Sequence, residues 1–517
     1  MIDPLDPADG SALAAQSLVG AYEDRAAREP DTPFARFDDR PPMTMGETMG
    51  AVRGFAGALR ERGLAAGDGV LLALDNSPEF LVGMLGTWYA GARMVPLVPE
   101  AGERLYRRAL ELVQPRLALA GPAGVAKLAA VGGHEALELV EVDDTAAEPL
   151  APQLARLAAG PAANENRATG LGEAAVMFTS GTTGPPKGVC LSHLWYVWAS
   201  RDLVAGMSYH AADVLYTCLP LGHANAQDTT LGPALISGAR VAFDRRFSAG
   251  AFWRRVRDAG ATAFNLIGNM PRVLLNRAGP EGTRDHAVTR GFAIPALPHY
   301  RRAFLERFGV ELLQGYGSTE IGVPVFQDDA AVRRGSCGLP VAGTRLRIMR
   351  PDGTPAATGD VGEICAWSAR PGAITHGYLR EAERTVQAWR AGWFHTGDLG
   401  RLDDDGHLFF AGRLGDALRR KGENLSAHDI ESVLLEMESV AECAVIGRRA
   451  DDGDDEIVAY VVVAEGRRLD PDEVATRCAN ALGRAAAPAE VLEVEALPRT
   501  ESGKVAKGAL RAEAVRA

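Results

Sequence analysis

Short apolar runs alternate with amphipathic stretches through the first half of the chain, and this alternation constrains the fold most strongly. Between residues 70 and 99, the run VLLAL is followed by the turn DNS, a helical stretch beginning at Pro78, and the run MVPLVP. Asn76 or Ser77 can cap this helix, and proline is well accommodated in a first helical turn. Similar runs, separated by amphipathic stretches, stand at 117–120, 239–243 and 262–268. The pattern predicts an α/β architecture with mostly parallel sheets.

The character of the sequence changes twice in the second half. From about residue 335, short alternating runs and the turn Pro351-Asp352-Gly353 predict a small β-rich unit. Beyond residues 409–416, a helix with one apolar face and Ser426 as its cap precedes two strand-like runs and another helix near 471–482. We therefore expect a large N-terminal domain over residues 1–414, made of α/β subdomains and the β-rich unit, and a small mobile α+β C-terminal domain over residues 415–517.

Charge and composition narrow the range of partners. The 517 residues are 47% hydrophobic with a formal net charge of -12, which argues against nucleic acid or an anionic membrane. Anionic ligands must then be held locally, by placed cations and backbone amides. No segment has the pattern of a signal peptide or a membrane span. The six cysteines lack metal-binding spacing, so we expect reduced thiols in a cytoplasmic protein.

A dense run of glycines and hydroxyl residues, TSGTTGPPKG, occupies residues 179–188 between two strand-like runs. The setting differs from a Walker A loop, because no helix follows and Pro186 stands where that motif needs a glycine. The chemistry is still that of an anion cradle: glycines let amides converge, hydroxyls add donors, and Lys187 adds a positive charge. An exposed linker, the alternative, does not explain three threonines and a lysine between two strands.

Four further segments offer nucleotide-binding chemistry, although each also has a plainer interpretation. LLQGYGSTEIG offers Tyr316 for stacking on a base and Glu320 as a hard ligand for Mg²⁺, yet such a glutamate is often merely solvated. Asp398 in HTGDLG can accept ribose hydroxyls or cap a turn, and Arg413 follows it in GRLGD. Lys504 stands in PRTESGK near the C-terminus, where a solvated tail is the alternative.

In order and spacing, these segments resemble the adenylate-forming superfamily of acyl-CoA synthetases, peptide-synthetase adenylation domains and luciferases. The resemblance runs from about residue 50 to about residue 510. It rests on a highly specific set: TSGTTGPPKG, GYGSTE, HTGDL, GRLGD with RRKGEN, and PRTESGK. PLGHANAQ at 220–227 and RRKGENLSAHDIE at 419–431 look most similar to bacterial acyl-CoA ligases of the crotonobetaine/carnitine-CoA ligase type.

The resemblance implies a two-step reaction that uses ATP, Mg²⁺ and CoA. A carboxylate attacks the α-phosphate of ATP to give acyl-AMP and pyrophosphate, and a thiol, usually that of CoA, then displaces AMP. Such an enzyme must neutralise phosphate charge and align the attack. The C-terminal domain is expected to rotate between the steps, carrying Lys504 away and bringing the face around Lys421, Gly422 and Glu423 to the site.

The family pattern also implies roles for individual residues. Lys504 bridges the carboxylate and the α-phosphate, Thr319 contacts the α-phosphate, and Glu320 holds Mg²⁺. His223 borders the acyl pocket and the thiol tunnel, with an ordinary loop histidine as the alternative. The other expected nucleotide-binding residues are Thr179, Ser180, Gly181, Thr182, Thr183, Gly184 and Lys187 for the phosphates, Gln314, Gly315 and Tyr316 for adenine, and Asp398 and Arg413 for ribose.

Two departures from the family pattern affect these expectations. Gly415 stands at the hinge position, which is commonly Asp or Lys in the family, and glycine permits the backbone change without favouring either state. The segment RGFAIPALP at 290–298 replaces a Gly-Gly-Ala-Pro-like adenine loop, so Phe292 and Ile294 are expected to reshape the adenine or acyl pocket.

The acceptor and the acid stay open at this point. The acyl group could pass to CoA, or to a carrier protein or partner enzyme in trans, and a nucleotide-binding regulator without catalysis is a third interpretation. A homodimer is also open. The family positions of the acyl pocket carry no charged side chain, which favours a mostly apolar acid. These positions are Trp195, Asn225, Ala226, Asn269, Met270 and Ile321.

Overall fold

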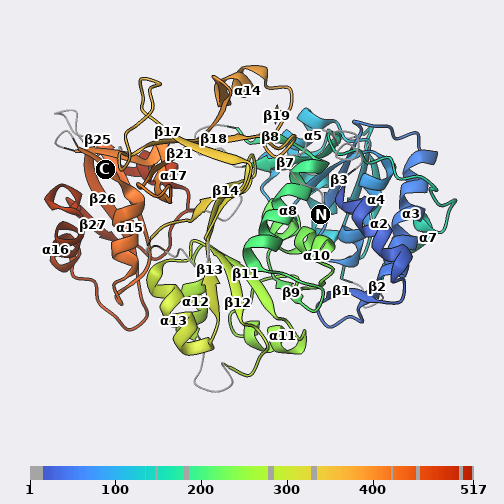
Figure 1. Ribbon diagram of the computed structural model, residues 1–517, viewed down its shortest axis with the longest axis horizontal. Helices are drawn as coiled ribbons and strands as arrows, with labels where there is room; N and C mark the ends of the chain where they lie inside the picture. The colour runs from blue at the N-terminus through green and yellow to red at the C-terminus, as the bar shows by residue number, and fades with distance from the viewer. Residues whose placement is uncertain are drawn as a thin grey trace.

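The computed structural model describes residues 16–133, 135–145, 150–179, 185–277, 284–327, 333, 335–420, 423–449, 455–499 and 505–514. Two seven-stranded sheets form the larger part of the molecule, with a β-rich unit beside them and a C-terminal unit at one end (Figure 1). No helix within these ranges is long and apolar enough to cross a membrane. The six cysteines are free thiols.

The first large sheet is parallel except at one edge, where β1 and β2 are antiparallel. In sheet order its strands are β13 (Glu311–Leu313), β12 (Arg290–Ile294), β11 (Ala263–Ile267), β9 (Val214–Thr217), β10 (Arg240–Phe243), β1 (Pro33–Phe37) and β2 (Met43–Thr44). Its accompanying helices are α2 (Leu18–Arg28), α8 (His193–Met207), α9 (Ala224–Ala226), the π-helix η2 (Gln227–Leu231), α10 (Gly232–Ser237), α11 (Phe252–Asp258), α12 (Met270–Arg277) and α13 (Pro298–Phe308).

The second large sheet has a parallel centre and an antiparallel edge formed by β7, β8 and β19. In sheet order its strands are β19 (Gly377–Tyr378), β8 (Lys187–Ser192), β7 (Glu173–Thr179), β4 (Arg93–Leu97), β3 (Gly69–Ala73), β5 (Leu117–Ala120) and β6 (Glu138–Glu141). Its helices are α3 (Met45–Glu61), α4 (Pro78–Ala90), α5 (Glu103–Val113), α6 (Pro122–Val131) and α7 (Pro152–Ala158).

Local signals explain why these elements form where they do. Helix α4 begins after Ser77, whose hydroxyl accepts a hydrogen bond from the Phe80 amide, and it ends at Gly91 in the left-handed conformation. Every residue of α4 is buried, so its sequence is apolar on all sides. One continuous apolar core includes α4, α8 and strands of both large sheets. The predicted α/β architecture with mostly parallel sheets is confirmed.

The β-rich unit lies against both large sheets and contains two antiparallel sheets. The smaller one consists of β14 (Gly315–Ser318), β15 (Gly322–Phe326) and β16 (Leu339–Pro340). The larger one consists of β17 (Thr344–Met349), β18 (Gly362–Ser368), β21 (Trp393–Leu402), β20 (Trp389–Arg390) and β22 (Leu408–Arg413), with helix α14 (Ala382–Ala388) nearby. Strand β14 lies at the middle of the molecule, where the units meet (Figure 1).

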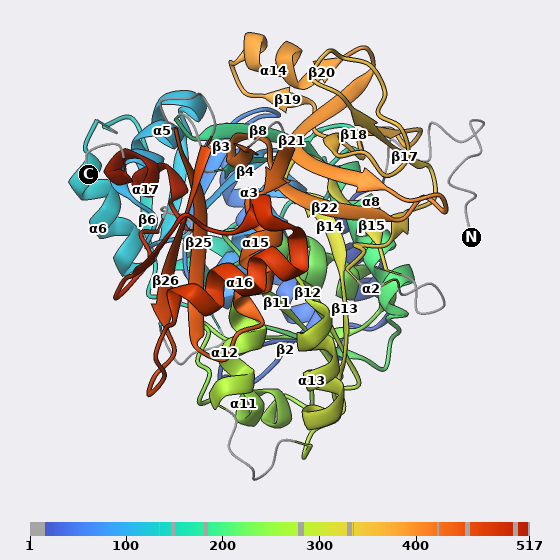
Figure 2. The same ribbon diagram turned by 90° about the vertical axis from the view of Figure 1, so that its left-hand side faces the viewer.

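The C-terminal unit follows the short 3₁₀ turn η4 (Leu414–Asp416). It contains the hairpin β23 (Ala417–Arg420) and β24 (Glu423–Ser426), and a three-stranded sheet of β25 (Val440–Arg449), β26 (Asp455–Val463) and β27 (Glu490–Glu493). Its helices are α15 (Ala427–Leu435), α16 (Pro471–Leu482), η5 (Arg484–Ala486) and α17 (Lys507–Ala514). Figure 2 views this unit face on, with α15 and α16 in front of its strands. Ser426 caps α15, as predicted.

Candidate active site

The hairpin of β14 and β15 supplies the centre of the site. A Cβ atom at Gly317 would lie 2.0 Å from the Gly322 carbonyl oxygen, and one at Gly315 would lie 2.8 Å from the Val325 carbonyl oxygen. Only glycine therefore allows the two strands to approach this closely. The tight hairpin presents Thr319 and Glu320 at its turn, where both are half-buried.

Asp398 is held between a tyrosine and an arginine. It lies on β21 opposite Arg413 of β22, and Arg413 Nε is 2.8 Å from Asp398 Oδ1. The Tyr316 hydroxyl donates to Asp398 Oδ2 at 2.8 Å. Burial and the neighbouring Asp398 charge raise the pKa of Tyr316 well above its ordinary value, so the phenol stays a donor. This arrangement fixes a carboxylate that can accept hydrogen bonds from sugar hydroxyls.

A second cluster forms at the other end of the same hairpin. The Tyr378 hydroxyl donates to Glu320 Oε1 at 3.2 Å, and the ammonium of Lys187 lies 4.8 Å from the centroid of the Tyr378 ring. Burial and the Glu320 charge raise the pKa of Tyr378 above its ordinary range. The cluster sets a cation and a carboxylate near each other, as a site for phosphates and a divalent metal requires.

Sequence reasoning did not single out Tyr378. It reaches the cluster because β19 pairs with β8, which begins at Lys187. The Thr375 amide, three residues before it, donates to the Glu320 carbonyl at 2.7 Å. No local pattern around Tyr378 distinguishes it from a core tyrosine.

Gln314 uses its side chain to hold the loop that follows β12. Its Oε1 accepts from the Ala296 amide at 2.6 Å, and its Nε2 donates to the Ser336 carbonyl at 3.1 Å. Phe292 is fully buried and stacks on Phe326 at 5.6 Å between ring centroids. Phe292 thus packs in the core directly behind Gly315 of β14, and its effect on a pocket stays a prediction. Ile294 is half-buried.

His223 lies at the start of α9, half-buried, and its amide donates to the Pro220 carbonyl at 3.0 Å. The segment before it is fixed by buried Asn76, which was predicted only as a possible helix cap. Asn76 Nδ2 donates to the Leu219 carbonyl at 2.8 Å, and its Oδ1 accepts from the Leu221 amide at 2.7 Å. Asn76 thus positions the loop that ends in His223.

The expected acyl-pocket positions divide into an apolar and an amide group. Trp195, Ala226, Met270 and Ile321 are buried. Asn225 Oδ1 accepts from Asn265 Nδ2 at 2.6 Å. Exposed Asn269, by contrast, donates to Glu442 Oε1 of β25 at 2.8 Å, which joins this loop to the C-terminal unit.

Sequence reasoning also passed over Asp228, one turn beyond these positions on η2. It is 5% exposed, and burial raises its pKa well above the ordinary value. Burial disfavours the charged form of a carboxyl group in this environment.

Several predicted residues lie outside the described part of the chain. The residues on either side of them in the sequence are described. Thr179 and Lys187 face each other across the β7–β8 pair. Strand β23 ends before Lys421 and β24 begins after Gly422, and Arg499 pairs with Val505 across an isolated bridge. The predicted residues concerned are Ser180, Gly181, Thr182, Thr183, Gly184, Lys421, Gly422 and Lys504.

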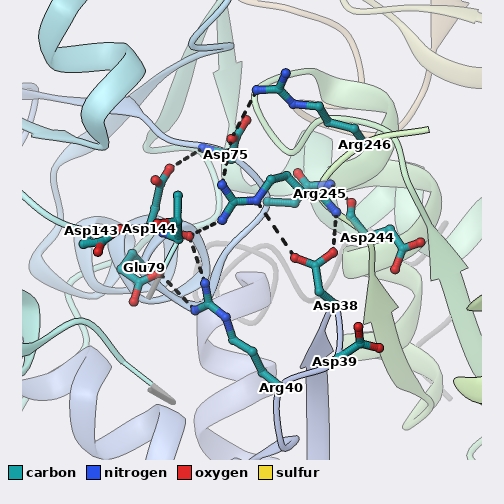
Figure 3. A network of polar contacts seen from close by, with 12 residues as sticks. Asp38, Asp39, Arg40, Asp75, Glu79, Asp143, Asp144, Asp244, Arg245 and Arg246 are labelled. Carbon is teal, nitrogen blue, oxygen red and sulfur yellow. Dashed lines mark hydrogen bonds and ion pairs between the residues drawn. The ribbon is translucent and has the colours of Figure 1, made fainter. Parts of the chain in front are cut away.

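A network of ion pairs joins the carboxyl ends of strands from both large sheets (Figure 3). Arg245, which follows β10, contacts Asp75, which follows β3, at 3.3 Å, and its amide donates to Asp38 at 2.9 Å. Arg40 donates to the Asp144 carbonyl at 2.9 Å and lies 3.8 Å from buried Glu79. These contacts fix the two sheets relative to each other. A cavity of about 340 Å³ lies beside the network and reaches Pro220, three residues before His223.

Comparison with known proteins identifies what the chain is similar to. Residues 22–379 match the family described as AMP-binding enzyme, and residues 429–504 match the AMP-binding enzyme C-terminal domain. The chain is 32% identical over 500 residues to sulfoacetate–CoA ligase of Cupriavidus necator, covering 95% of this chain and 96% of the relative.

Two further relatives and a solved structure are also similar to this chain over most of its length. The chain is 33% identical over 461 residues to steroid-22-oyl-CoA synthetase of Rhodococcus jostii, covering 86% and 81% of the two chains. It is 30% identical over 470 residues to crotonobetaine/carnitine–CoA ligase of Salmonella paratyphi A, covering 87% and 89%. The crystal structure of ATP-bound MatB from Rhodopseudomonas palustris has a TM-score of 0.86 at 26% identity, covering 96% of this chain and 98% of that one.

Proposed function

This chain belongs to the AMP-binding enzyme family and is an AMP-forming acyl-CoA ligase, and we propose that it activates a mostly apolar carboxylic acid at the β14–β15 hairpin. One observation carries the proposal. The two ends of this hairpin hold two complementary clusters: Tyr316 with Asp398 and Arg413 at one end, and Glu320 with Tyr378 and Lys187 at the other. The first suits a ribose and the second suits phosphates, so ATP can lie along the hairpin.

In the first step, an oxygen of the acid bonds to the α-phosphorus of ATP while the bond from that phosphorus to the bridging oxygen breaks, releasing pyrophosphate. Asp398 and Arg413 hold the ribose, and Lys187 with the 179–184 loop holds the outgoing phosphates. Thr319 contacts the α-phosphate, and Lys504 neutralises charge where the carboxylate and phosphate meet. These roles position reactants whose negative charges repel each other.

Glu320 and Thr319 offer the hard oxygen donors that Mg²⁺ prefers, and Glu320 shares its neighbour Tyr378 with the cation Lys187, so the residues present suit a phosphate-bound magnesium ion. Mg²⁺ would supply positive charge to the phosphate oxygens. Tyr378 orients the Glu320 carboxylate by its hydrogen bond.

In the second step, the sulfur of CoA bonds to the acyl carbon, the bond from that carbon to the AMP oxygen breaks, and AMP and the thiol proton are released. We assign His223 to the border of the path that the thiol takes. We take residues 415–517 as a separate mobile domain that exchanges the Lys504 segment for the face around Lys421 and Gly422. Asp416, directly after Gly415, pairs with Lys507 and Arg511 of α17, so the chain joins the C-terminal body immediately beyond the hinge.

The acid is proposed to be mostly apolar because the described pocket positions are apolar or already bonded to protein partners. Four of the six expected positions are buried apolar side chains. The two amides, Asn225 and Asn269, are hydrogen-bonded to Asn265 and Glu442. No arginine or lysine stands among these six positions to bind a second acidic group. A steroid acid is the substrate named for one relative, although another acts on the polar sulfoacetate.

A carrier-protein thiol is the second candidate acceptor, and the comparisons do not favour it. The relatives matched over most of the chain are named as CoA ligases or a CoA synthetase. A nucleotide-binding regulator without catalysis would not require the two clusters of the hairpin.

Replacing Lys504 by Ala tests the division of labour between the two steps. We expect the variant to lose acid-dependent pyrophosphate release, while converting supplied acyl-AMP and CoA to acyl-CoA at nearly the wild-type rate. Lys127→Ala on α6 is the matched control and should leave both steps unchanged. Pyrophosphate release that persists in the Lys504 variant, or equal loss of both steps, would contradict the assigned role.

A further inference from the structure

Three side chains of different ligand chemistry meet on one face of the β-rich unit. Glu363 and Cys365 are two residues apart on β18, so both point to the same face of the sheet. His395 of β21 is the cross-strand neighbour of Cys365. A carboxylate, a thiol and an imidazole are thereby brought together by backbone register alone.

The potential ligand atoms converge on one point. Cys365 Sγ is 3.3 Å from His395 Nδ1, which is 2.7 Å from Glu363 Oε2, and one atom from each residue lies within 4.8 Å of the others. The ligand atoms of a tetrahedral zinc site are separated by roughly 3–4 Å, given bond lengths of about 2.0–2.3 Å. Small side-chain movements would therefore bring all three onto one ion.

A cation already occupies this position. Arg390 Nη2 lies 2.6 Å from His395 Nδ1 and 3.1 Å from Glu363 Oε2. A guanidinium can only donate hydrogen bonds, so the contact with Arg390 uses the lone pair of His395 Nδ1, whereas the contact of Nδ1 with Glu363 Oε2 uses an Nδ1 proton. The Arg390 side chain is 56% exposed, whereas those of Glu363 and His395 are 15% and 10% exposed. Arg390 can swing into solvent while the other three residues stay in place.

We propose that Glu363, Cys365 and His395 form a binding site for a borderline-soft divalent cation, with Zn²⁺ as the best fit, and that the ion displaces the Arg390 guanidinium. The donor set of one sulfur, one nitrogen and one oxygen suits zinc and its chemical neighbours. Magnesium and calcium prefer oxygen ligands and are disfavoured.

The site is distinct from the cluster assigned to ribose but adjoins it. Glu363 Oε1 accepts a hydrogen bond from the Gly397 amide at 3.1 Å, and Gly397 directly precedes Asp398. An ion on Glu363 would thus bind one residue away from the carboxylate that the proposed function assigns to ATP. Binding of the ion does not depend on that assignment, and it can be measured without turnover.

Cobalt titration of the full-length protein tests the site, because Co²⁺ bound by a thiolate gives a near-ultraviolet charge-transfer band. We expect such a band in the wild type, its loss on addition of Zn²⁺, and its absence in Cys365→Ser. Glu363→Gln, at a partly exposed position, should weaken Co²⁺ binding at least tenfold without replacing the buried thiol. Cobalt at Glu320 would give no thiolate band, so failure of the proposed ATP site would not imitate this result.

Substitution of Arg390 gives the sharper test, because its guanidinium competes with the metal ion for the same position. Arg390→Ala should tighten Co²⁺ and Zn²⁺ binding severalfold, whereas a merely structural hydrogen-bond cluster would be loosened by the same change. Asp403→Asn is the matched control, because Asp403, Asp405 and His407 form the other such group found in the described ranges. Any of four results would overturn the proposal: no band in the wild type, a band that survives Cys365→Ser, a loss of Co²⁺ binding in Arg390→Ala, or a loss of Co²⁺ binding in Asp403→Asn.

Discussion

Tyr316 illustrates how much one hydroxyl contributes to the geometry of the site. It lies on β14 and fixes Asp398 on β21, which is 82 residues away in the sequence. Its ring is buried in the apolar core of the β-rich unit. Removing the hydroxyl should therefore leave the fold in place and free one carboxylate oxygen to rotate.

Tyr316→Phe should raise the KM for ATP by about fivefold, because the lost hydrogen bond contributes about 1 kcal/mol. Pyrophosphate release at varied ATP concentration measures the effect. Tyr22→Phe is the matched control, since buried Tyr22 donates to the Met45 carbonyl at 3.2 Å, away from the hairpin. It should lower stability without changing KM. An unchanged KM in the Tyr316 variant would show that Asp398 does not need this partner.

His193 links the buried core to acid stability. It is 2% exposed, its ring packs edge-on against Trp88 at 5.4 Å, and burial lowers its pKa from 6.5 to about 3. The unfolded chain takes up a proton near pH 6.5, whereas the folded chain does not until the pH approaches 3. Its contribution to the free energy of unfolding is therefore fully present above pH 6.5 and is lost as the pH falls toward 3.

His193→Leu should remove that pH dependence. Between about pH 6.5 and pH 5, the wild type should lose about 2 kcal/mol more of its unfolding free energy than the variant does, at about 1.4 kcal/mol per pH unit. Urea denaturation at both pH values measures the difference. Identical losses in the two proteins would show that His193 does not set the acid response.

At the scale of elements, the β14–β15 hairpin depends on glycine. Gly317→Ala would place a Cβ atom 2.0 Å from the Gly322 carbonyl oxygen, so we expect a loss of about 2–3 kcal/mol in stability and severely reduced pyrophosphate release. Gly50→Ala in helix α3 is the contrasting control. A Cβ atom there meets nothing within 4 Å, so the change should stabilise by about 0.5–1 kcal/mol. Thermal unfolding of both variants distinguishes the effects, and a neutral Gly317 variant would contradict the packing described.

Elements with local signals were predictable, and contacts between distant strands were not. Helix α16 spans Pro471–Leu482, as predicted, because Asp470 caps it and proline starts it. The pairing of Tyr378 with Glu320 was missed, since these residues are 58 positions apart and meet only through sheet pairing. The burial of Phe292 was missed for a related reason. Its position in the sequence matched a loop, but the neighbouring strand buried it against Phe326.

The same distinction applies to the site: sequence motifs predicted its residues, whereas the contacts that hold those residues in place were not predictable. The glycine-rich segments bring Tyr316, Glu320, Asp398 and Arg413 to one hairpin and its neighbours, where the sequence predicted a nucleotide site. The hydrogen bonds that Gln314 and Asn76 make with backbone groups could not be predicted. Such bonds depend on which loops meet in space, and neither residue type nor spacing specifies that.

At the scale of the whole molecule, we propose that the two reaction steps use different placements of the C-terminal unit. In the structure this unit contacts the N-terminal part through Asn269 with Glu442, and through Phe410 with His428 at 5.1 Å between rings. Gly415 lies in the short turn between them and has no neighbour that a Cβ atom would meet. A substitution at Gly415 therefore acts through the backbone conformation and not through side-chain contacts.

Gly415→Pro should spare one half-reaction and impair the other by at least tenfold, because proline fixes the φ angle that rotation has to change. Pyrophosphate release reports the first step, and conversion of supplied acyl-AMP with CoA reports the second. Gly415→Ala is the milder control and should affect both steps little. Equal loss of both steps in the proline variant would argue against a hinge at this position.

The central claim is that one chain joins a mostly apolar acid to CoA through an acyl-AMP intermediate. The most direct measurement incubates the protein with ATP, Mg²⁺ and a panel of aliphatic, alicyclic, aromatic and dicarboxylic acids, with and without CoA, and identifies the products by mass. We predict pyrophosphate release and an acyl-CoA product with members of the apolar classes, and acyl-AMP when CoA is omitted. Acyl-AMP that accumulates without thioester even when CoA is present, or turnover confined to dicarboxylic acids, would contradict the account.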